Sequence, residues 1–96
     1  MRLLNSCIIE GAMGSSPDEN GKFYITHDRT SKNSQGEEIV CKSHFFVVVN
    51  GKMRKIVSDS FEKGRGIRVV GYLKTDEKGR AEIISEHIEF KPTLNN

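Results

Sequence analysis

The segment Ile39–Asn50 constrains the fold most, because it concentrates β-branched and aromatic residues and is the strongest predicted strand of the chain. Counting with a period of two separates its side chains into two faces. One face is wholly apolar and is expected to meet the core: Phe45, Val47 and Val49. The other face is mixed: His44, Phe46, Val48 and Asn50. A mixed face of this kind is typical of a functional or interface surface.

The period of the pattern changes directly after this strand. Apolar residues now recur at helical spacing: Met53, Ile56, Val57 and Phe61. Gly64 follows Lys63 and is a typical C-terminal stop signal. The sequence therefore predicts one short helix within residues 51–64.

Four further segments are predicted to be strands, at residues 1–13, 22–29, 66–75 and 81–90. A turn cluster at 14–22, a polar loop at 30–38 and a tight connection at 76–80 separate them. Gly71 lies inside the fourth strand, where it predicts a bulge or a sharp bend.

Three strands, a helix and two strands in this order fit the five-stranded Greek-key barrel called the OB-fold, an all-β fold with a helix between strands three and four. An SH3-like barrel is the main alternative, but it usually lacks a helix of this length at this position. A chain of 96 residues is near the lower limit for one core without disulfides or metal. We expect one OB-fold domain over residues 1–92 and a short tail at 93–96.

Composition restricts the partners and the compartment. The net charge of +2 permits contact with nucleic acid but is smaller than that of dedicated duplex binders. Cys7 and Cys41 form no C-x-x-C motif and have no His at ligand spacing, which favours two reduced thiols over a disulfide. The N-terminus is too short and too polar for a signal peptide, and no run has the length of a membrane span. We expect a cytoplasmic protein without a membrane partner.

The sequence offers no support for catalysis. Its three histidines fall in different predicted strands, and several acidic residues fall in turns: Asp18, Glu19, Asp76 and Glu77. The segment GRGIRVVG lacks the Lys-Ser/Thr that a phosphate-binding loop requires. We therefore expect a protein that is not an enzyme and that has neither a cofactor nor a metal.

Five motifs in order resemble bacterial single-stranded DNA-binding proteins. The first motif is the spacing of Asn5, Gly11, Gly14 and Pro17. The others are VVVNGKM, FEKG, IRVVGYLKT with the family's Gly-x-Leu-x-Thr, and SEHIEF. The resemblance spans residues 5–90. It implies an OB-fold protein that binds single-stranded DNA without sequence preference, in replication, repair or replication restart.

The chain also departs from the family. It has no Trp, whereas members typically stack bases on tryptophans, and the family's third-strand tryptophan corresponds best to Ser43 or His44. Base stacking is worth roughly 1–3 kcal/mol per base, so binding per domain is expected to be weaker unless charge compensates. From the given residues we expect a protein without the acidic-tipped extension that the family uses to recruit replication enzymes. This layout resembles the primosomal replication protein N branch; a divergent or mobile-element-borne binder is the alternative.

The candidate nucleic-acid-binding residues are aromatic and basic. Phe46 beside His44 is the best candidate for a base-stacking platform, with a subunit interface as the alternative reading; Tyr24 and Tyr72 are further candidates for stacking. The cations on or beside the predicted strands are Lys42, Lys52, Arg54, Arg68, Lys74 and Arg80. Lys74 lies where the family usually has a basic residue. Three or four phosphate contacts would give a log–log salt slope of about −2 to −3.

The resemblance further implies that Leu4, Ser6 and Ile8 of the first strand join two subunits into a continuous sheet. We expect a homodimer or homotetramer, in which several weak grooves act on one strand. The expected partners are single-stranded DNA and replication or restart proteins. The competing hypothesis is an OB-fold adaptor of the replisome with little nucleic-acid binding, whose interface comprises His44, Phe46 and Asn50.

Overall fold

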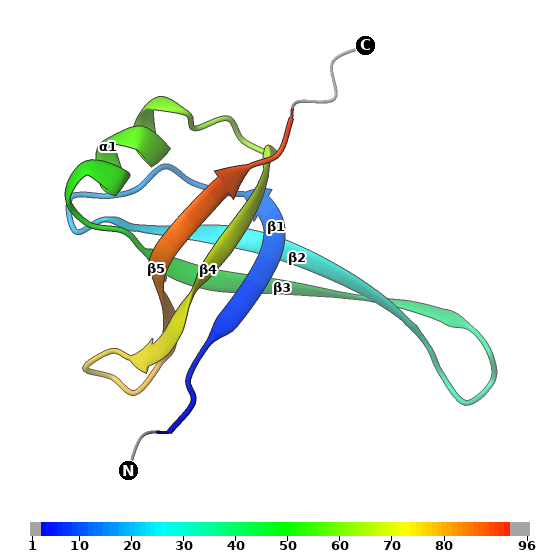
Figure 1. Cartoon of the computed structure of the whole chain (residues 1–96). Helices are drawn as coiled ribbons and strands as arrows, with labels where there is room; N and C mark the ends of the chain where they lie inside the picture. Colours follow the sequence, from blue (N-terminus) through cyan, green and yellow to red (C-terminus); the bar gives the residue numbers. More distant parts are fainter. Residues whose placement is uncertain (1–2, 93–96) are drawn as a thin grey trace.

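The computed structural model describes residues 3–92, which form a closed five-stranded barrel and one helix (Figure 1). The elements are β1 (Cys7–Met13), β2 (Lys22–Lys32), β3 (Glu38–Val48), α1 (Gly51–Asp59), β4 (Gly66–Thr75) and β5 (Ala81–Phe90). Around the barrel the strands run in the order β1-β2-β3-β5-β4, with β3 and β5 parallel and every other pair antiparallel. The predicted OB-fold, with its helix between the third and fourth strands, is confirmed. The predicted tail at 93–96 lies outside the described residues.

Alternating apolar side chains of the strands fill the barrel. The buried core comprises Met13, Phe23, Ile25, Val47, Val49, Val57, Ile67, Val69, Ile83 and Ile88. α1 lies at one end of the barrel (Figure 1), where Val57 is fully buried. Ile56, which the helical pattern placed among the apolar positions, is 51% exposed. α1 is too short and too polar to cross a membrane, and it is the only helix in the described part of the chain.

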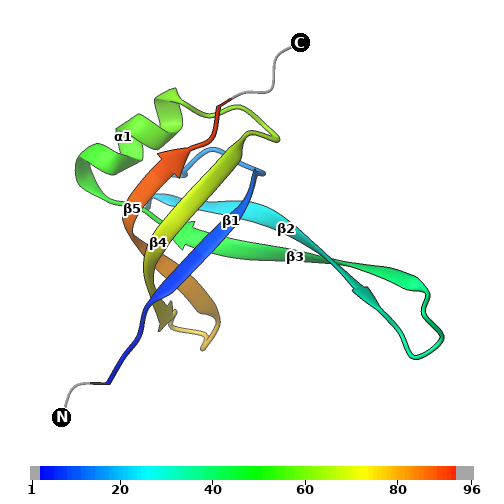
Figure 2. The same ribbon diagram turned by 45° about the vertical axis from the view of Figure 1, so that its right-hand side comes forward.

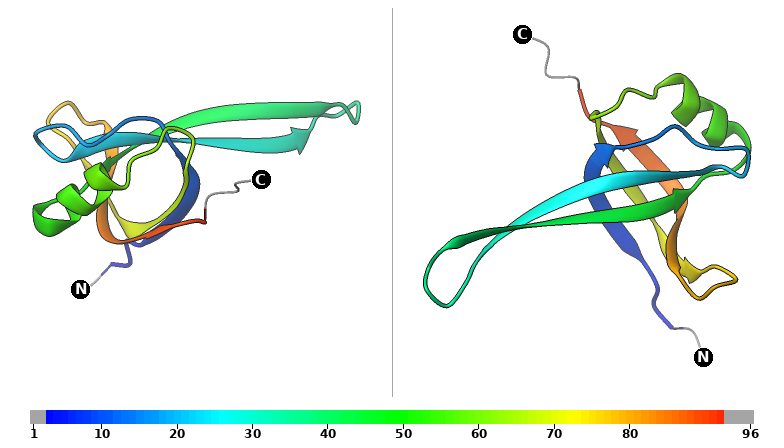
Figure 3. Two further views of the ribbon diagram at one scale, coloured as in Figure 1. Left: turned by 90° about the horizontal axis from the view of Figure 1, so that it is seen from above. Right: turned by 180° about the vertical axis from the view of Figure 1, so that it is seen from behind.

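Strands β2 and β3 continue beyond the barrel as a two-stranded ribbon (Figures 1 and 2). They pair without interruption from Lys22↔Val48 to Lys32↔Glu38, so the prediction of a loop over residues 30–38 was wrong at both ends of that segment. Backbone pairing continues there although the side chains are polar. The turn is closed by Asn33, whose Oδ1 accepts hydrogen bonds from two backbone N–H groups of residues 35 and 37. We call residues 28–42 the arm; it leaves the barrel tangentially (Figure 3).

Gly71 forms the predicted bulge in β4. The register of β4 against β5 shifts between Val70 and Gly71. A Cβ at Gly71 would overlap the carbonyl oxygen of Ile84, so the two backbones approach this closely only because the residue is glycine. The bulge allows β4 to curl and close the barrel.

Three further predicted boundaries differ from the structure. β3 ends at Val48 rather than at Asn50, which is the N-cap residue of α1. α1 ends at Asp59, five residues before Gly64, because the N–H groups of Ser60 and Phe61 close the last turn on carbonyls of α1. Gly64 instead lies in the following turn with a φ of +88°. β1 starts at Cys7 rather than at the N-terminus; before it, the Asn5 side chain bonds the backbone N–H and carbonyl of Leu73 at 2.9 and 2.8 Å.

Candidate nucleic-acid interface

Three aromatic side chains meet on the outward face of β2 and β3. Tyr24 is the register partner of Phe46, and His44 lies two residues before Phe46 on the same face. The rings of Tyr24 and His44 stack with centroids 5.5 Å apart, and Phe46 meets Tyr24 edge-on at 6.5 Å. Phe46 remains 45% exposed. We call Tyr24, His44 and Phe46 the aromatic cluster; its rings are held against one another, and the ring of Phe46 is presented to solvent.

The strand register extends this surface around the barrel. Val48 of β3 pairs with Ile84 of β5, which pairs in turn with Tyr72 of β4. Tyr72 is 37% exposed, and its neighbour on the same face of β4 is Lys74. One outward strip therefore crosses four strands, with aromatic rings at both ends and aliphatic side chains between them. We call it the strip: Lys22, Tyr24, His44, Phe46, Val48, Tyr72, Lys74, Glu82 and Ile84.

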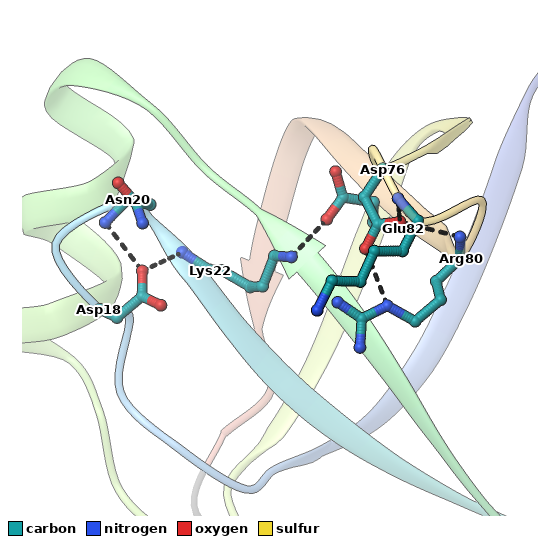
Figure 4. Close-up of polar contacts among 7 residues, drawn as sticks. Asp18, Asn20, Lys22, Asp76, Arg80 and Glu82 are labelled. Atoms are coloured by element: carbon teal, nitrogen blue, oxygen red, sulfur yellow. Dashed lines mark hydrogen bonds and ion pairs between the residues drawn. The ribbon is translucent and has the colours of Figure 1, made fainter.

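Lys22 is a site residue that the sequence reasoning did not include. Its ammonium lies 5.6 Å from the centroid of the Phe46 ring and 2.8 Å from Glu82 Oε2. Figure 4 shows Lys22 extending from β2 toward Glu82, beside the turn of Asp76 and Arg80. A signal for Lys22 did exist, since the period that buries Phe23 and Ile25 places residue 22 on the same face as Tyr24.

Three of the predicted cations lie on the strip or beside it. Lys42 lies on the exposed face of β3 that carries His44 and Phe46, and Lys74 is exposed near the end of β4. Arg80 belongs to the β4–β5 turn, which lines a hollow of about 390 Å³ together with Lys22. Its Nε donates a hydrogen bond of 3.0 Å to Asp76, and the backbone N–H of Arg80 is the main cause that lowers the pKa of that carboxyl group.

Lys52 and Arg54 lie apart from the strip, on α1. Both are exposed, and Arg54 Nε donates a hydrogen bond of 3.0 Å to the carbonyl oxygen of Asp18 in the β1–β2 loop. This contact ties the helix to the loop at the end of the barrel. Binding by these two residues stays a prediction.

Arg68 lies in a network of charges on β1, β4 and β5. Its guanidinium is 2.7 Å from Glu10 and 3.7 Å from Glu89, and Lys91 is 2.9 Å from Glu10. Hydrogen bonds from Lys91 and Arg68 hold the pKa of the Glu10 carboxyl group below its usual value. The predicted role of Arg68 in binding remains untested, but two carboxylates already neutralise this cation.

The underside of the ribbon faces a separate hollow of about 830 Å³. Its walls are partly apolar and include Ile8, Cys41, Phe45 and Val70. Phe45 was predicted to face the core with Val47 and Val49, yet it is 36% exposed and lines this hollow. The prediction was wrong because β3 begins to leave the barrel at Phe45. The side of β3 that faces the core at Val47 therefore faces the hollow at Phe45.

The residues predicted to form a subunit interface are exposed. Leu4 and Ile8 are 95% and 69% exposed, and Ser6 is exposed as well. β1 pairs with β4 over residues 7–12 but with β2 only at Ala12 and Met13. The edge of β1 that faces the ribbon is therefore mostly without a strand partner in the described part of the chain.

No metal site is indicated in the described residues, where no group of three or more His, Cys, Asp or Glu side chains could hold an ion. The buried residues within 3–92 are all apolar or glycine. The chemistry that this surface supports is stacking and ionic contact, both of which are reversible.

Comparison with known proteins supports the fold. The structure resembles the Plasmodium falciparum SSB in complex with ssDNA, with a TM-score of 0.79, 20% identity and coverage of 96% of this chain and 98% of that one. It also resembles the small single-stranded DNA-binding protein from Streptomyces coelicolor, with a TM-score of 0.70, 17% identity and coverage of 94% and 96%.

A third similar structure is the single-stranded DNA-binding protein from Thermus aquaticus, with a TM-score of 0.76, 21% identity and coverage of 95% of this chain. This chain spans about half (52%) of that longer protein. No family model and no curated protein matches the sequence. At 17–21% sequence identity, these comparisons establish that this chain has the same barrel fold as the three proteins.

Proposed function

We propose that this protein binds single-stranded DNA without sequence preference. The observation that carries the proposal is the aromatic cluster, in which Phe46 is presented on the outward face of an OB-fold barrel with Lys22 beside it. Flat rings bordered by amines suit unpaired bases and their phosphates, because every base has a face that can stack. Three structural neighbours, from different organisms, are named single-stranded DNA-binding proteins.

In this proposal the strand crosses the barrel along the strip. Bases stack on Phe46 at one end and on Tyr72 at the other, and Val48 and Ile84 supply apolar contact between them. Phosphates are neutralised by the cations on the strip or beside it: Lys22, Lys42, Lys74 and Arg80. The absence of tryptophan makes each contact weaker than in typical members of the family.

We further propose a role in DNA replication, repair or replication restart in the cytoplasm, with membership of the single-stranded DNA-binding family and of its primosomal replication protein N branch. The motif order of the sequence and the shared barrel support this proposal. Replication or restart proteins are the corresponding protein partners.

A second copy of the chain completes the proposed assembly. The largely unpaired edge of β1 and the exposed side chains of Leu4 and Ile8 offer backbone and apolar surface for β1 of another subunit. A homodimer or homotetramer built in this way would let two or more strips engage one DNA strand.

The test is fluorescence anisotropy with labelled oligo-dT of increasing length at low and moderate salt. Binding should strengthen with length and weaken with salt, and the substitutions Phe46→Ala and Lys74→Gln should reduce it. Binding that these substitutions leave unchanged, or no binding at low salt, would favour the adaptor hypothesis. The specific feature in favour of an adaptor is the partly apolar hollow beneath the arm.

A further inference from the structure

Glu82 is an acidic residue on a surface otherwise suited to a polyanion. It lies on the outward face of β5, where its register partner on β4 is Lys74 and the neighbouring strand is β3 with Phe46. Repulsion between this carboxylate and phosphate opposes the proposed function, which is the premise of this inference. A carboxylate at such a position needs a role other than attraction of the backbone.

The surroundings of Glu82 show that its charge is compensated locally. Its side chain is only 13% exposed, Oε2 is buried, and Lys22 Nζ lies 2.8 Å from that oxygen. The same ammonium lies over the ring of Phe46 at 5.6 Å. One lysine therefore both neutralises Glu82 and covers the best stacking platform of the molecule.

A base that stacks on Phe46 competes with Lys22 for the face of the ring. When the ammonium moves away, a phosphate is its natural new partner, since a mobile lysine acts as a point charge. Glu82 is then left with little solvent and without its cation, and an unpaired, desolvated carboxylate is costly. Since Lys22 joins Phe46 to Glu82, the edge of a base stacked on Phe46 is the group placed to replace the ammonium beside this carboxylate.

Bases differ in what they offer to a carboxylate. Cytosine presents its 4-amino group, which is the donor that Glu or Asp side chains accept in direct readout. Uracil and thymine present a 4-carbonyl oxygen at the same position, and their N3–H is flanked by two carbonyl oxygens that a carboxylate repels. Cytosine therefore relieves the unpaired carboxylate, whereas uracil and thymine increase the repulsion.

We propose that Glu82 gives the strip, which reads no defined order of bases, a bias in base type, and that it favours bases with an exocyclic amino group, cytosine in particular, over uracil and thymine. The preference for cytosine then arises from a hydrogen bond between its 4-amino group and the Glu82 carboxylate, and not from stronger stacking. Glu82 is a specificity residue whose action depends on the departure of Lys22 from Phe46.

The test measures the affinity of the protein for labelled oligo-dC and oligo-dU at weakly alkaline pH and low salt. Both oligonucleotides have about 20 nucleotides, so that each is longer than one binding site. These two polymers differ in the ring only at N3 and the 4-position, so stacking is closely matched. The wild-type protein should bind oligo-dC more tightly, by about tenfold. A wild-type ratio of one would refute the proposal.

The variant Glu82→Gln keeps the shape, removes the charge and adds an amide donor that pairs with a 4-carbonyl. It should bind oligo-dU more tightly than the wild-type protein does. The ratio of the affinity for oligo-dC to that for oligo-dU should fall from about ten to between about one and two. Glu86→Gln is the matched control, because it removes the same charge from an exposed position on β5 and should keep the wild-type ratio. Equal tightening on both polymers by Glu82→Gln would show a purely electrostatic effect and overturn the proposal. Failure of the wild-type protein to bind either polymer would instead refute the proposed function.

Discussion

The rings of Tyr24 and His44 stack across the β2–β3 ribbon, with centroids 5.5 Å apart and planes inclined by 29°. Phe46 meets the same tyrosine edge-on, at an interplanar angle of 71°. Tyr24 therefore contacts both neighbours, while Phe46 keeps almost half of its surface exposed. The cluster is ordered before any ligand binds, which reduces the entropy lost on binding.

Truncation of the exposed ring should weaken binding of single-stranded DNA. Phe46→Ala removes the face on which a base stacks, at a cost of roughly 1–3 kcal/mol, or about fivefold to 150-fold in Kd. Anisotropy titration with a short oligo-dT that fits one domain measures this loss without a contribution from avidity.

The matched control is the adjacent phenylalanine. Phe45 is exposed to a similar extent, but it points from the opposite face of β3 into the hollow beneath the arm. Phe45→Ala should leave the affinity for the short oligonucleotide within about twofold. Equal losses for the two variants would contradict the location of the site on the strip.

The sequence was sufficient to predict the barrel because its determinants are local. Alternation buries Phe23, Ile25 and Val47, the change to helical spacing marks α1, and the glycine within β4 marks the bulge. The glycine of the bulge and the period-two pattern of the strands can each be recognised from neighbouring residues in the sequence.

The candidate site was less predictable because it depends on register between distant segments. The ionic contact of Lys22 with Glu82 joins residues sixty positions apart, and no local pattern indicates it. Phe45 was assigned to the core because period two cannot show where a strand leaves the barrel. Arg68 was grouped with the other cations because its carboxylate partners come from two other strands.

Two basic residues of β4 should differ in their effect on the salt dependence of binding. Lys74 belongs to the strip, whereas Arg68 is engaged by Glu10 and Glu89. Lys74→Gln should therefore reduce the log–log salt slope by about 0.7, the value for one phosphate contact on a single strand. Arg68→Gln should leave the slope nearly unchanged. Titrations at a series of salt concentrations decide this, and a reduced slope for Arg68→Gln would place that residue on the DNA path.

Substitution of the bulge glycine should destabilise the barrel. Gly71→Ala forces its Cβ against the carbonyl oxygen of Ile84, and overpacking of this kind costs about 1–3 kcal/mol or more. The melting temperature should fall by roughly 10 °C. Gly36→Asn is the control, because Asn tolerates the φ of +79° and no described atom lies within 4 Å of the added Cβ. A similar fall for both variants would argue against a close approach at Gly71.

The carboxyl group of Glu10 should make stability depend on pH. Its pKa in the folded protein is lowered from 4.5 by Lys91 and Arg68, so its contribution is present above about 4.5 and is lost as pH falls through the lower folded value. Glu10→Gln should lower the melting temperature at neutral pH, and the difference from wild type should shrink to nothing in acid. High salt should reduce the difference as well. Thermal melts across pH test this, and a difference independent of pH would exclude the ionic explanation.

An exposed isoleucine of β1 should control assembly. Ile8 is 69% exposed beside the hollow that Phe45 and Val70 line, and the neighbouring edge of β1 is largely unpaired. The mass measured by light scattering should be that of a dimer or tetramer for the wild-type protein and that of a monomer for Ile8→Lys. The variant should dissociate because its interface would bury an unpaired ammonium.

The isoleucine of the helix supplies the control for assembly. Ile56 is 51% exposed on α1, away from β1, so Ile56→Lys should keep the wild-type mass. Binding to a short oligonucleotide should survive in the Ile8→Lys monomer, while the gain in affinity with oligonucleotide length should be lost, because the second strip is no longer tethered to the first. A monomeric wild-type protein, or equal masses for the two variants and the wild type, would show that β1 is not the contact between subunits.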